Sequence, residues 1–204
     1  MIVVVDFGMG NLRSIVHKMA KLNIPAEISS DPDKIKNATK IILPGVGAFG
    51  SGINNLINLG LVDILNQKVL IEKIPILGVC VGLQIMCLKG EEGDVAGLGW
   101  LDAEVKRFRF PEDSDLRVPH VGWNTLIKKH DSRLLDGFEP ERRFYFTHSF
   151  FVNCEHPQDI VASTVYGIEF ASVINHDNIY GVQFHPEKSH KKGTEVYKNF
   201  VEYC

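Results

Sequence analysis

The chain has 204 residues, a formal net charge of −3, and ordinary proportions of hydrophobic (45%) and charged (23%) residues. This length suits one sizeable domain with its own core, so we expect residues 1–204 to form a single domain. The lack of a basic excess argues against nucleic acid as a partner. No apolar run approaches the roughly 20 residues of a membrane span, and the apolar N-terminus lacks the positive region of a signal peptide.

The first half of the chain alternates apolar runs with segments of helical spacing. Strands are expected at Ile2–Asp6, Ala26–Ser29, Lys40–Leu43 and Pro75–Val79. Helical spacing links them, from Leu12 to Leu22 and then up to Leu70 with a break near Gly60. Continuous apolar runs suit strands covered on both faces, and this alternation predicts a parallel sheet with helices on both sides.

A glycine-rich loop, Pro44–Gly50, follows the third expected strand. It is open to three interpretations: a plain turn, a phosphate-binding loop, or an oxyanion hole. The GK[ST] ending of a P-loop is missing. The position beside the strand that leads to Cys80 favours an oxyanion hole, made by backbone N–H groups of this loop together with that of Val81.

Cys80 stands between an expected strand and an expected helix, with Gly78 two residues before it and Gly82 two residues after it. A lone free cysteine is most often a small buried core residue. A nucleophile at a tight strand-to-helix turn, however, needs small neighbours, because the backbone is strained there and a substrate approaches closely. The setting of Cys80 therefore favours a nucleophile.

The other three cysteines have no comparable setting. Cys87, Cys154 and Cys204 show neither a CxxC spacing with a partner nor a metal-finger pattern, and we assign them to packing or the surface. We therefore expect free thiols, a cytoplasmic location, and neither a metal nor a cofactor.

His185 and Glu187 lie two residues apart, separated by Pro186. In an extended segment such residues point the same way, so the carboxylate can hold the imidazole in one tautomer. Alone, the triplet reads as a turn with a solvated glutamate. Following a strand and paired with the cysteine motif, it favours a base and its orienting carboxylate. Sites in open α/β sheets form at the carboxyl ends of strands, so we expect Cys80 and the glycine loop at one edge.

The second half of the chain carries short strand candidates separated by turn residues. They are Glu104–Phe108, Trp123–Ile127, Arg143–Thr147, Phe150–Asn153, Ile160–Val165, Phe170–Asn175 and Ile179–Phe184. Helical spacing returns from Val196 to Val201. Trp123 reads equally well as a core aromatic or as an interface anchor.

The segment from Gly78 to Gln84 and the triplet from His185 to Glu187 resemble those of the class I (triad) glutamine amidotransferases. Within that family the chain is most similar to the glutaminase subunits of imidazole glycerol phosphate synthases. Four further blocks carry the resemblance: Pro44–Gly50, Pro119–Asn124, Phe144–Ser149 and Gly181–Ser189. Departures are small, with Val81, Leu83 and Thr147 where the family usually has leucine, methionine and valine.

The resemblance implies a flavodoxin-like α/β fold: a largely parallel central sheet flanked by helices, with additional antiparallel strands in the C-terminal half. It implies that Cys80 attacks the side-chain amide of glutamine, that His185 moves the proton, and that Glu187 orients His185. The resemblance also implies that the peptides of Gly45, Val46 and Gly47 form the oxyanion hole. Glutamate and ammonia are the expected products.

The resemblance also implies binding roles. The residues expected to hold glutamine are Gln84, Glu92, His148 and Ser149. The residues expected to face a synthase subunit are Asn11, Trp123 and Lys188. That partner is a (βα)8-barrel cyclase, which uses the ammonia to make imidazole glycerol phosphate and an aminoimidazole carboxamide ribotide in histidine biosynthesis. Free ammonia would be protonated and diluted in water, which supports delivery to a docked partner in a heterodimer.

Three other functions remain open at this point. A paralogous subunit pair supplies ammonia for amidination of sugars in surface polysaccharides. A cysteine peptidase or esterase-like hydrolase uses a similar turn. A non-catalytic binding module is disfavoured by the intact Cys80, His185 and Glu187.

Overall fold

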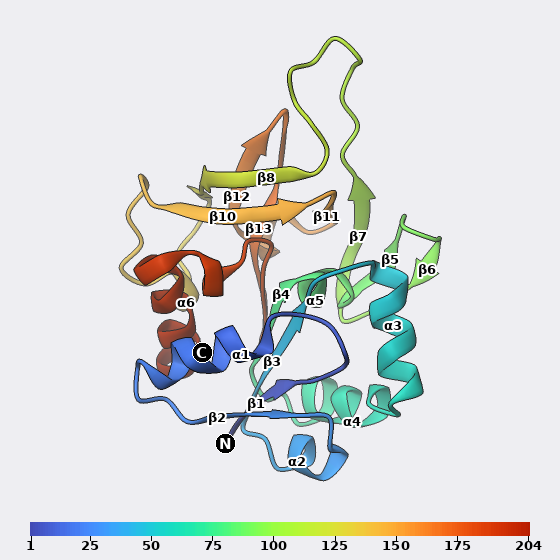
Figure 1. Ribbon diagram of the computed structural model, residues 1–204, viewed down its shortest axis with the longest axis vertical. Coiled ribbons are helices and arrows are strands. Elements are labelled where there is room, and N and C mark those ends of the chain that lie inside the picture. Colours follow the sequence, from blue (N-terminus) through green and yellow to red (C-terminus); the bar gives the residue numbers. More distant parts are fainter.

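The computed structural model describes residues Met1–Cys204, which form one twelve-stranded sheet flanked by helices and a separate two-stranded ribbon (Figure 1). One part of the sheet is parallel, in the order β2-β1-β3-β4-β14. Its strands are β1 (Ile2–Val5), β2 (Ala26–Ser29), β3 (Lys40–Gly45), β4 (Ile76–Cys80) and β14 (Ile179–Val182). All except the half-buried edge strand β2 are largely buried, as expected for apolar runs covered on both sides.

The sheet continues from β14 through β13, β11, β7, β5 and β6, and most of these pairs are antiparallel. These strands and the two attached to them are β5 (Cys87–Gly90), β6 (Val95–Ala96), β7 (Leu101–Arg107), β9 (Ile127–Lys128), β11 (Phe150–Cys154), β12 (Ile160–Tyr166) and β13 (Ile168–His176). The ribbon pairs β8 (His120–Thr125) with β10 (Arg143–His148), and Figure 1 shows it lying across this second part of the molecule.

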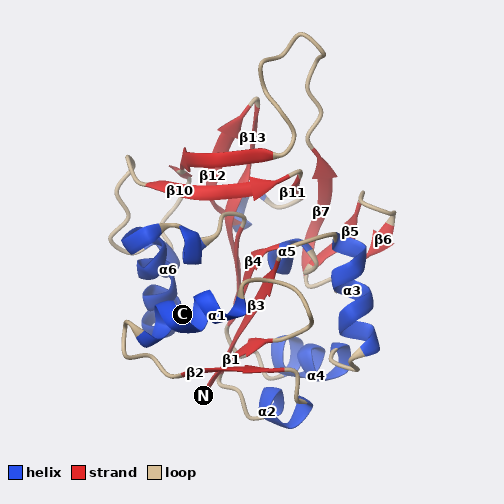
Figure 2. Cartoon of the chain, in the orientation of Figure 1, coloured by secondary structure: helices blue, strands red, loops and turns tan.

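Helices cover both sides of the parallel strands, as Figure 2 shows, with α1 and α6 together on one side and α3 and α4 on the other. The helices are α1 (Leu12–Ala20), α2 (Pro32–Lys36), α3 (Phe49–Asn58), α4 (Val62–Asn66), the π-helical turn η1 (Gln67–Ile71), α5 (Val81–Gln84) and α6 (His190–Tyr203). Three 3-10 turns complete the set: η2 (Arg133–Leu135), η3 (Pro157–Asp159) and η4 (Pro186–Lys188). None of the helices has the length and apolarity needed to cross a membrane.

The predicted fold class is confirmed, and most predicted elements are present within a few residues. The helix expected after Cys80 is present but short, because α5 ends at Gln84 and the chain enters β5 three residues later. The strand predicted at Trp123–Ile127 is two strands, β8 and β9, which pair with different neighbours. The elements α2, β5 and β6 were not predicted, since they are too short to show a periodic pattern.

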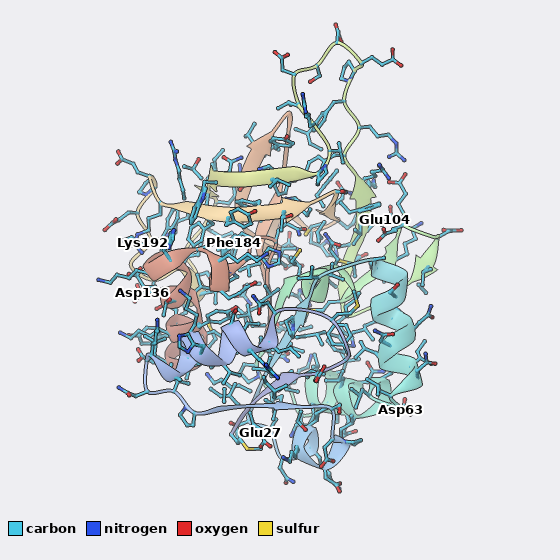
Figure 3. All side chains as sticks on the ribbon, viewed as in Figure 1. Glu27, Asp63, Glu104, Asp136, Phe184 and Lys192 are labelled. Carbon is cyan, nitrogen blue, oxygen red and sulfur yellow. The ribbon has the colours of Figure 1, made fainter.

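The interior is one continuous cluster of 52 buried hydrophobic residues. Figure 3 shows Phe184 inside the fold, whereas the labelled charged residues Glu27, Asp63, Glu104 and Lys192 project from the periphery. Phe184 packs against Phe144 with ring centroids 4.2 Å apart. Burying such an aromatic side chain stabilises the fold by about 1.5–3 kcal/mol. This contact joins β10 to the segment that follows β14, the segment that carries His185.

Candidate active site

Three parallel strands end side by side at the candidate site. Gly45 at the end of β3 lies opposite Cys80 at the end of β4, and β14 runs beside β4 with Gly181 opposite Gly78. Three residues beyond the end of β14 the chain reaches His185. The predicted shared edge is therefore confirmed: the glycine loop and Cys80 lie together at the carboxyl ends of these strands, and His185 follows from the neighbouring one.

Cys80 occupies a strained turn between β4 and α5. Its φ of 55° and ψ of −111° lie outside the regions that non-glycine residues ordinarily adopt. The flanking glycines have a packing reason that differs from the predicted one. A Cβ on Gly82 would overlap the carbonyl oxygen of Leu43, and one on Gly78 would lie 2.7 Å from the Cα of Leu83. The glycines therefore allow the turn to pack directly on β3 and on itself.

His185 and Glu187 form a buried pair. Their side chains are 1% and 2% exposed, and His185 Nδ1 lies 2.8 Å from Glu187 Oε1. Tyr197 OH donates to the other carboxylate oxygen over 3.4 Å. Since Nδ1–H donates to Glu187, the other ring nitrogen, Nε2, is the basic one. This Nε2 atom is buried and has no hydrogen-bond partner, so it is free to exchange a proton.

The electrostatic surroundings favour a proton on His185. Burial opposes a charged imidazole, but the sulfur of Cys80 and the carboxylate of Glu187 favour it more strongly. Together they raise the pKa of His185 to about 10. Such an imidazole is suited to take a proton from a thiol and to keep it until a leaving group needs it.

A cavity of about 250 Å³ opens over Cys80. Its lining residues are Val46, Gly47, Cys80, Val81, Gln84, Glu92, Pro119, Thr147, His148, Ser149 and Phe150. The backbone N–H groups of Val46 and Gly47 are not engaged in hydrogen bonds within the chain. Val81 is the first residue of α5, where the N–H has no intrahelical acceptor. Backbone donors without a partner in the chain thus belong to residues that line the cavity beside Cys80.

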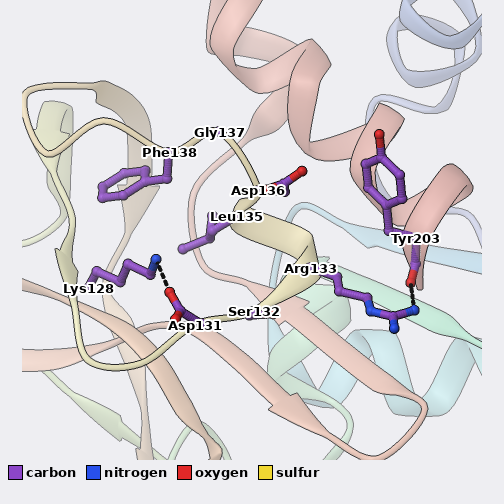
Figure 4. Close-up of a pocket in the computed structure, with 9 residues that line it drawn as sticks. All are labelled: Lys128, Asp131, Ser132, Arg133, Leu135, Asp136, Gly137, Phe138 and Tyr203. Atoms are coloured by element: carbon purple, nitrogen blue, oxygen red, sulfur yellow. Dashed lines mark hydrogen bonds and ion pairs between the residues drawn. The ribbon is translucent and has the colours of Figure 1, made fainter.

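A larger cavity of about 550 Å³ lies elsewhere, between η2 and the end of α6 (Figure 4). Lys128 pairs with Asp131 across its mouth, and Arg133 donates to the carbonyl of Tyr203 over 3.1 Å. Lys128 and Asp131 form an ion pair, Arg133 is bound to a backbone carbonyl, and no cysteine or histidine lines this cavity. The smaller cavity, which holds the candidate nucleophile Cys80, is therefore the candidate active site.

The Glutamine amidotransferase class-I family matches residues 3–204. The chain belongs to this family. Family membership supports a glutaminase rather than a peptidase, an esterase-like hydrolase or a non-catalytic module. "Imidazole glycerol phosphate synthase subunit HisH 2" of Methanococcus maripaludis is 46% identical over 99% of both chains. The subunits of Pseudomonas aeruginosa ("HisH 2") and Leptospira interrogans ("HisH") are 44% and 43% identical, over 98–99% of this chain and 99% of each relative.

Solved structures share the fold of this amidotransferase. A putative GMP synthase protein from Thermoplasma acidophilum gives a TM-score of 0.72 at 20% identity, over 98% of this chain and 91% of that one. PurLQS from Thermotoga maritima gives a TM-score of 0.71 at 20% identity, over 99% and 97% of the two chains. At such identities the likeness concerns the fold alone.

The residues predicted to hold glutamine all line the cavity of the amidotransferase, but three of them also bind the protein itself. Gln84 Nε2 donates to the carbonyl of Phe150 over 2.9 Å, and His148 Nδ1 lies 2.7 Å from the same oxygen. Glu92 Oε2 accepts the N–H of Phe49 over 2.7 Å and so caps α3. Of the predicted oxyanion group, Gly45 lies buried in β3 and does not line the cavity.

The residues predicted to face a partner lie outside the cavity. Trp123 is 43% exposed and stacks on His190, with ring centroids 5.0 Å apart and planes 5° apart. The Nζ atom of the exposed Lys188 lies 5.6 Å from the ring centroid of Tyr145, on which Trp123 also packs edge to face. Asn11 is exposed at the start of α1, a helix that contacts η4. The exposure of Trp123 favours the anchor interpretation.

The sequence interpretation missed two polar side chains of the site. Gln183 is fully buried, and its Nε2 lies 3.6 Å from Cys80 Sγ. It stands two residues before His185, and that spacing was the available signal for a side chain on the same side. His120 Nδ1 lies 3.0 Å from His148 Nε2, and no local spacing indicates this pair.

Proposed function

We propose that this amidotransferase is the glutaminase subunit of an imidazole glycerol phosphate synthase, with residues 1–204 acting as one domain. The observation that carries the proposal is that Cys80, at a strained turn over a cavity, interacts with His185 of the buried His185–Glu187 pair. The full-length similarity to HisH subunits supports the choice of synthase.

In the first half of the reaction, His185 Nε2 takes the proton of the Cys80 thiol, and the sulfur attacks the side-chain amide carbon of glutamine. The negative charge that develops on the amide oxygen is stabilised by the N–H groups of Val46, Gly47 and Val81. The cavity wall formed by Gln84, Glu92, His148 and Ser149 holds the substrate. Glu187 keeps His185 in the tautomer that leaves Nε2 basic.

In the second half, His185 delivers its proton to the departing nitrogen, so that ammonia leaves and a thioester remains on Cys80. Water then attacks the thioester carbon while His185 accepts one of its protons. The sulfur departs, glutamate is released, and the thiol is restored by the proton on His185. The balance is glutamine plus water giving glutamate plus ammonia.

The ammonia is delivered to a (βα)8-barrel cyclase subunit that docks on the face bearing Asn11, Trp123 and Lys188. This face lies behind the triad, because Lys188 follows directly after Glu187 in η4. The four cysteines are free thiols, and Cys80 must stay reduced to react, so we place the protein in the cytoplasm.

Replacement of Cys80 by alanine tests the proposal in the complex with the cyclase subunit. Glutamine-dependent synthesis should fall by at least about a thousandfold, since the nucleophile is lost. Synthesis from added ammonium salt should persist, because the cyclase is intact. Cys204→Ala is the matched control and should retain both activities. Glutamine turnover by Cys80→Ala would contradict the proposal.

A second candidate is delivery of ammonia to a sugar-amidinating synthase. The numbering "HisH 2" on relatives from Methanococcus maripaludis and Pseudomonas aeruginosa favours keeping it, since it fits more than one such subunit in an organism. Complementation distinguishes the two. The gene should restore growth without histidine to a strain that carries the matching cyclase but lacks its own glutaminase subunit. Failure of a stably expressed complex to do so would favour the sugar pathway.

A further inference from the structure

A hydrogen-bonded chain of two glutamines lies behind the nucleophile. Gln183 Nε2 lies 3.6 Å from Cys80 Sγ, and Gln183 Oε1 accepts from Gln84 Nε2 over 3.0 Å. Gln183 is 0% exposed, and its backbone N–H donates to the carbonyl of Ser172, on the neighbouring strand β13. The side chain is therefore held in place at the sulfur, although it belongs to neither the triad nor the cavity wall.

The direction of this chain is determined by one backbone carbonyl. The oxygen of Phe150 can only accept, so Gln84 presents its NH2 group to it, over 2.9 Å. The same NH2 group reaches Gln183, which must accept with its carbonyl oxygen. The amide of Gln183 is thereby turned so that its NH2 group faces Cys80. A flipped Gln183 would place two donors against each other and an oxygen against the sulfur.

An amide donor at this position suits a sulfur that becomes negative. A hydrogen bond to a charged acceptor is stronger than one to a neutral acceptor, so the contact favours the thiolate over the thiol. His185 must give up its proton during the reaction, whereas Gln183 donates without transferring a proton. Its contribution is therefore present each time the sulfur carries charge.

We propose that Gln183 is a further catalytic residue, which donates a hydrogen bond to Cys80 Sγ and stabilises the thiolate that attacks glutamine. Gln84 and the Phe150 carbonyl hold its amide in the donating orientation. In the step itself the thiol proton goes to His185 Nε2, the sulfur lone pair forms the bond to the amide carbon, and Gln183 keeps both of its amide protons. This inference rests on the proposed role of Cys80 as nucleophile.

The test is the pH dependence of Cys80 alkylation by iodoacetamide in the full chain, measured by mass spectrometry of the Cys80 peptide. Gln183→Met and Gln183→Leu both remove the donor. At neutral pH each variant should be alkylated at least about tenfold more slowly than wild type. The midpoint of the curve of alkylation rate against pH should move upward by about one pH unit or more. The rates should converge with wild type at high pH. The other ionisable side chains at the site, His185, Glu187, Glu92 and His148, are unchanged in both variants.

Gln158→Met, on the exposed turn η3, is the matched control and should alkylate as wild type does. Circular dichroism identifies folded variants, and Gln183→Leu serves if the methionine variant does not fold. A folded variant with the wild-type midpoint overturns the inference while leaving the proposed function intact. If Cys80 of the wild-type chain shows no enhanced reactivity over Cys154 and Cys204, the proposed function fails and this inference fails with it.

Discussion

His185, the proposed catalytic histidine, and a nearby pair of histidines are all buried, yet their pKa values are shifted in opposite directions. The pKa of His185 is raised to about 10, whereas burial lowers the pKa of His120 to about 4 and that of His148 to about 3. His185 sits between a carboxylate and a sulfur. His120 and His148 sit among aromatic rings, with His120 stacked on Tyr166 at a centroid distance of 4.0 Å.

Burial alone does not decide whether a histidine is protonated. All three are at most 6% exposed. His185 lies beside the Cys80 sulfur and has Glu187 as a hydrogen-bonded counter-charge. The pair has only neutral acceptors, namely the Phe150 carbonyl for His148 and His148 itself for His120. The sulfur and the carboxylate together outweigh the cost of desolvation at His185, and nothing does so at the other two histidines.

The largest expected effect concerns proton transfer by His185. His185→Ala should lower kcat/KM for glutamine by about a thousandfold, since general acid–base catalysis contributes about a hundredfold to ten thousandfold. His120→Gln, which replaces a buried neutral histidine, should cost far less. Steady-state glutaminase assays of the two variants in the complex check this ranking. Equal losses would remove the functional contrast between the two histidine environments.

The next effect removes the counter-charge from His185. Glu187→Gln keeps the shape of the side chain but not its charge, so the pKa of His185 should fall from about 10 toward its ordinary value. Activity should decline by about a hundredfold because the imidazole loses its orientation and part of its basicity. A titration of His185 by NMR measures the shift. An unchanged pKa would show that Cys80 alone holds the proton on the imidazole.

The neutral pair should make the fold sensitive to acid. Unfolded histidines, with an ordinary pKa near 6.5, bind protons as the pH falls below that value, while His120 and His148 in the folded chain stay neutral down to about 4 and 3. The contribution of these two histidines to the unfolding free energy is therefore fully present above pH 6.5 and is lost as the pH falls toward 4. Between pH 6 and pH 5 each histidine should lower the unfolding free energy by about 1 kcal/mol.

The contribution of His185 to stability depends on pH in the opposite sense, and it changes little between pH 6 and pH 5. Its raised pKa adds stability that is fully present below pH 6.5 and is lost as the pH rises toward 10. Urea unfolding at pH 6 and pH 5 measures the acid loss, and His120→Gln should shrink it by about 1 kcal/mol, because one of the two neutral histidines is gone. The same fall in unfolding free energy in wild type and His120→Gln would show that His120 and His148 do not cause the acid sensitivity.

The smallest effect on the isolated chain should come from the outer side of β8, the strand that carries His120. Trp123 is 43% exposed, so Trp123→Ala should change the unfolding free energy by about 1 kcal/mol or less. The affinity of the Trp123→Ala chain for the cyclase subunit should fall by about tenfold or more. Truncation of a tryptophan at the centre of an interface typically costs about 2 kcal/mol of binding free energy. Urea unfolding and calorimetric titration measure the two. A large loss of stability with unchanged affinity would make Trp123 a core residue.

Local spacing was enough to predict the nucleophile, the base and the carboxylate of the proposed active site. Glycines two residues either side of Cys80 indicated a tight turn, and the two-residue step from His185 to Glu187 placed base and carboxylate together. The apolar runs also predicted the parallel strands whose ends carry these groups. Such features depend on backbone geometry over a few residues, which the order of amino acids determines directly.

Contacts between distant segments were decided only by the tertiary structure. Gln84 and Gln183 are 99 residues apart, His120 and His148 are 28 apart, and Glu92 caps a helix that begins 43 residues earlier. The orientation of the Gln183 amide and the opposite titration of the histidines follow from these contacts. Hydrogen bonding and desolvation depend on which groups the packed core brings within about 3 Å, and no spacing along the chain encodes that distance.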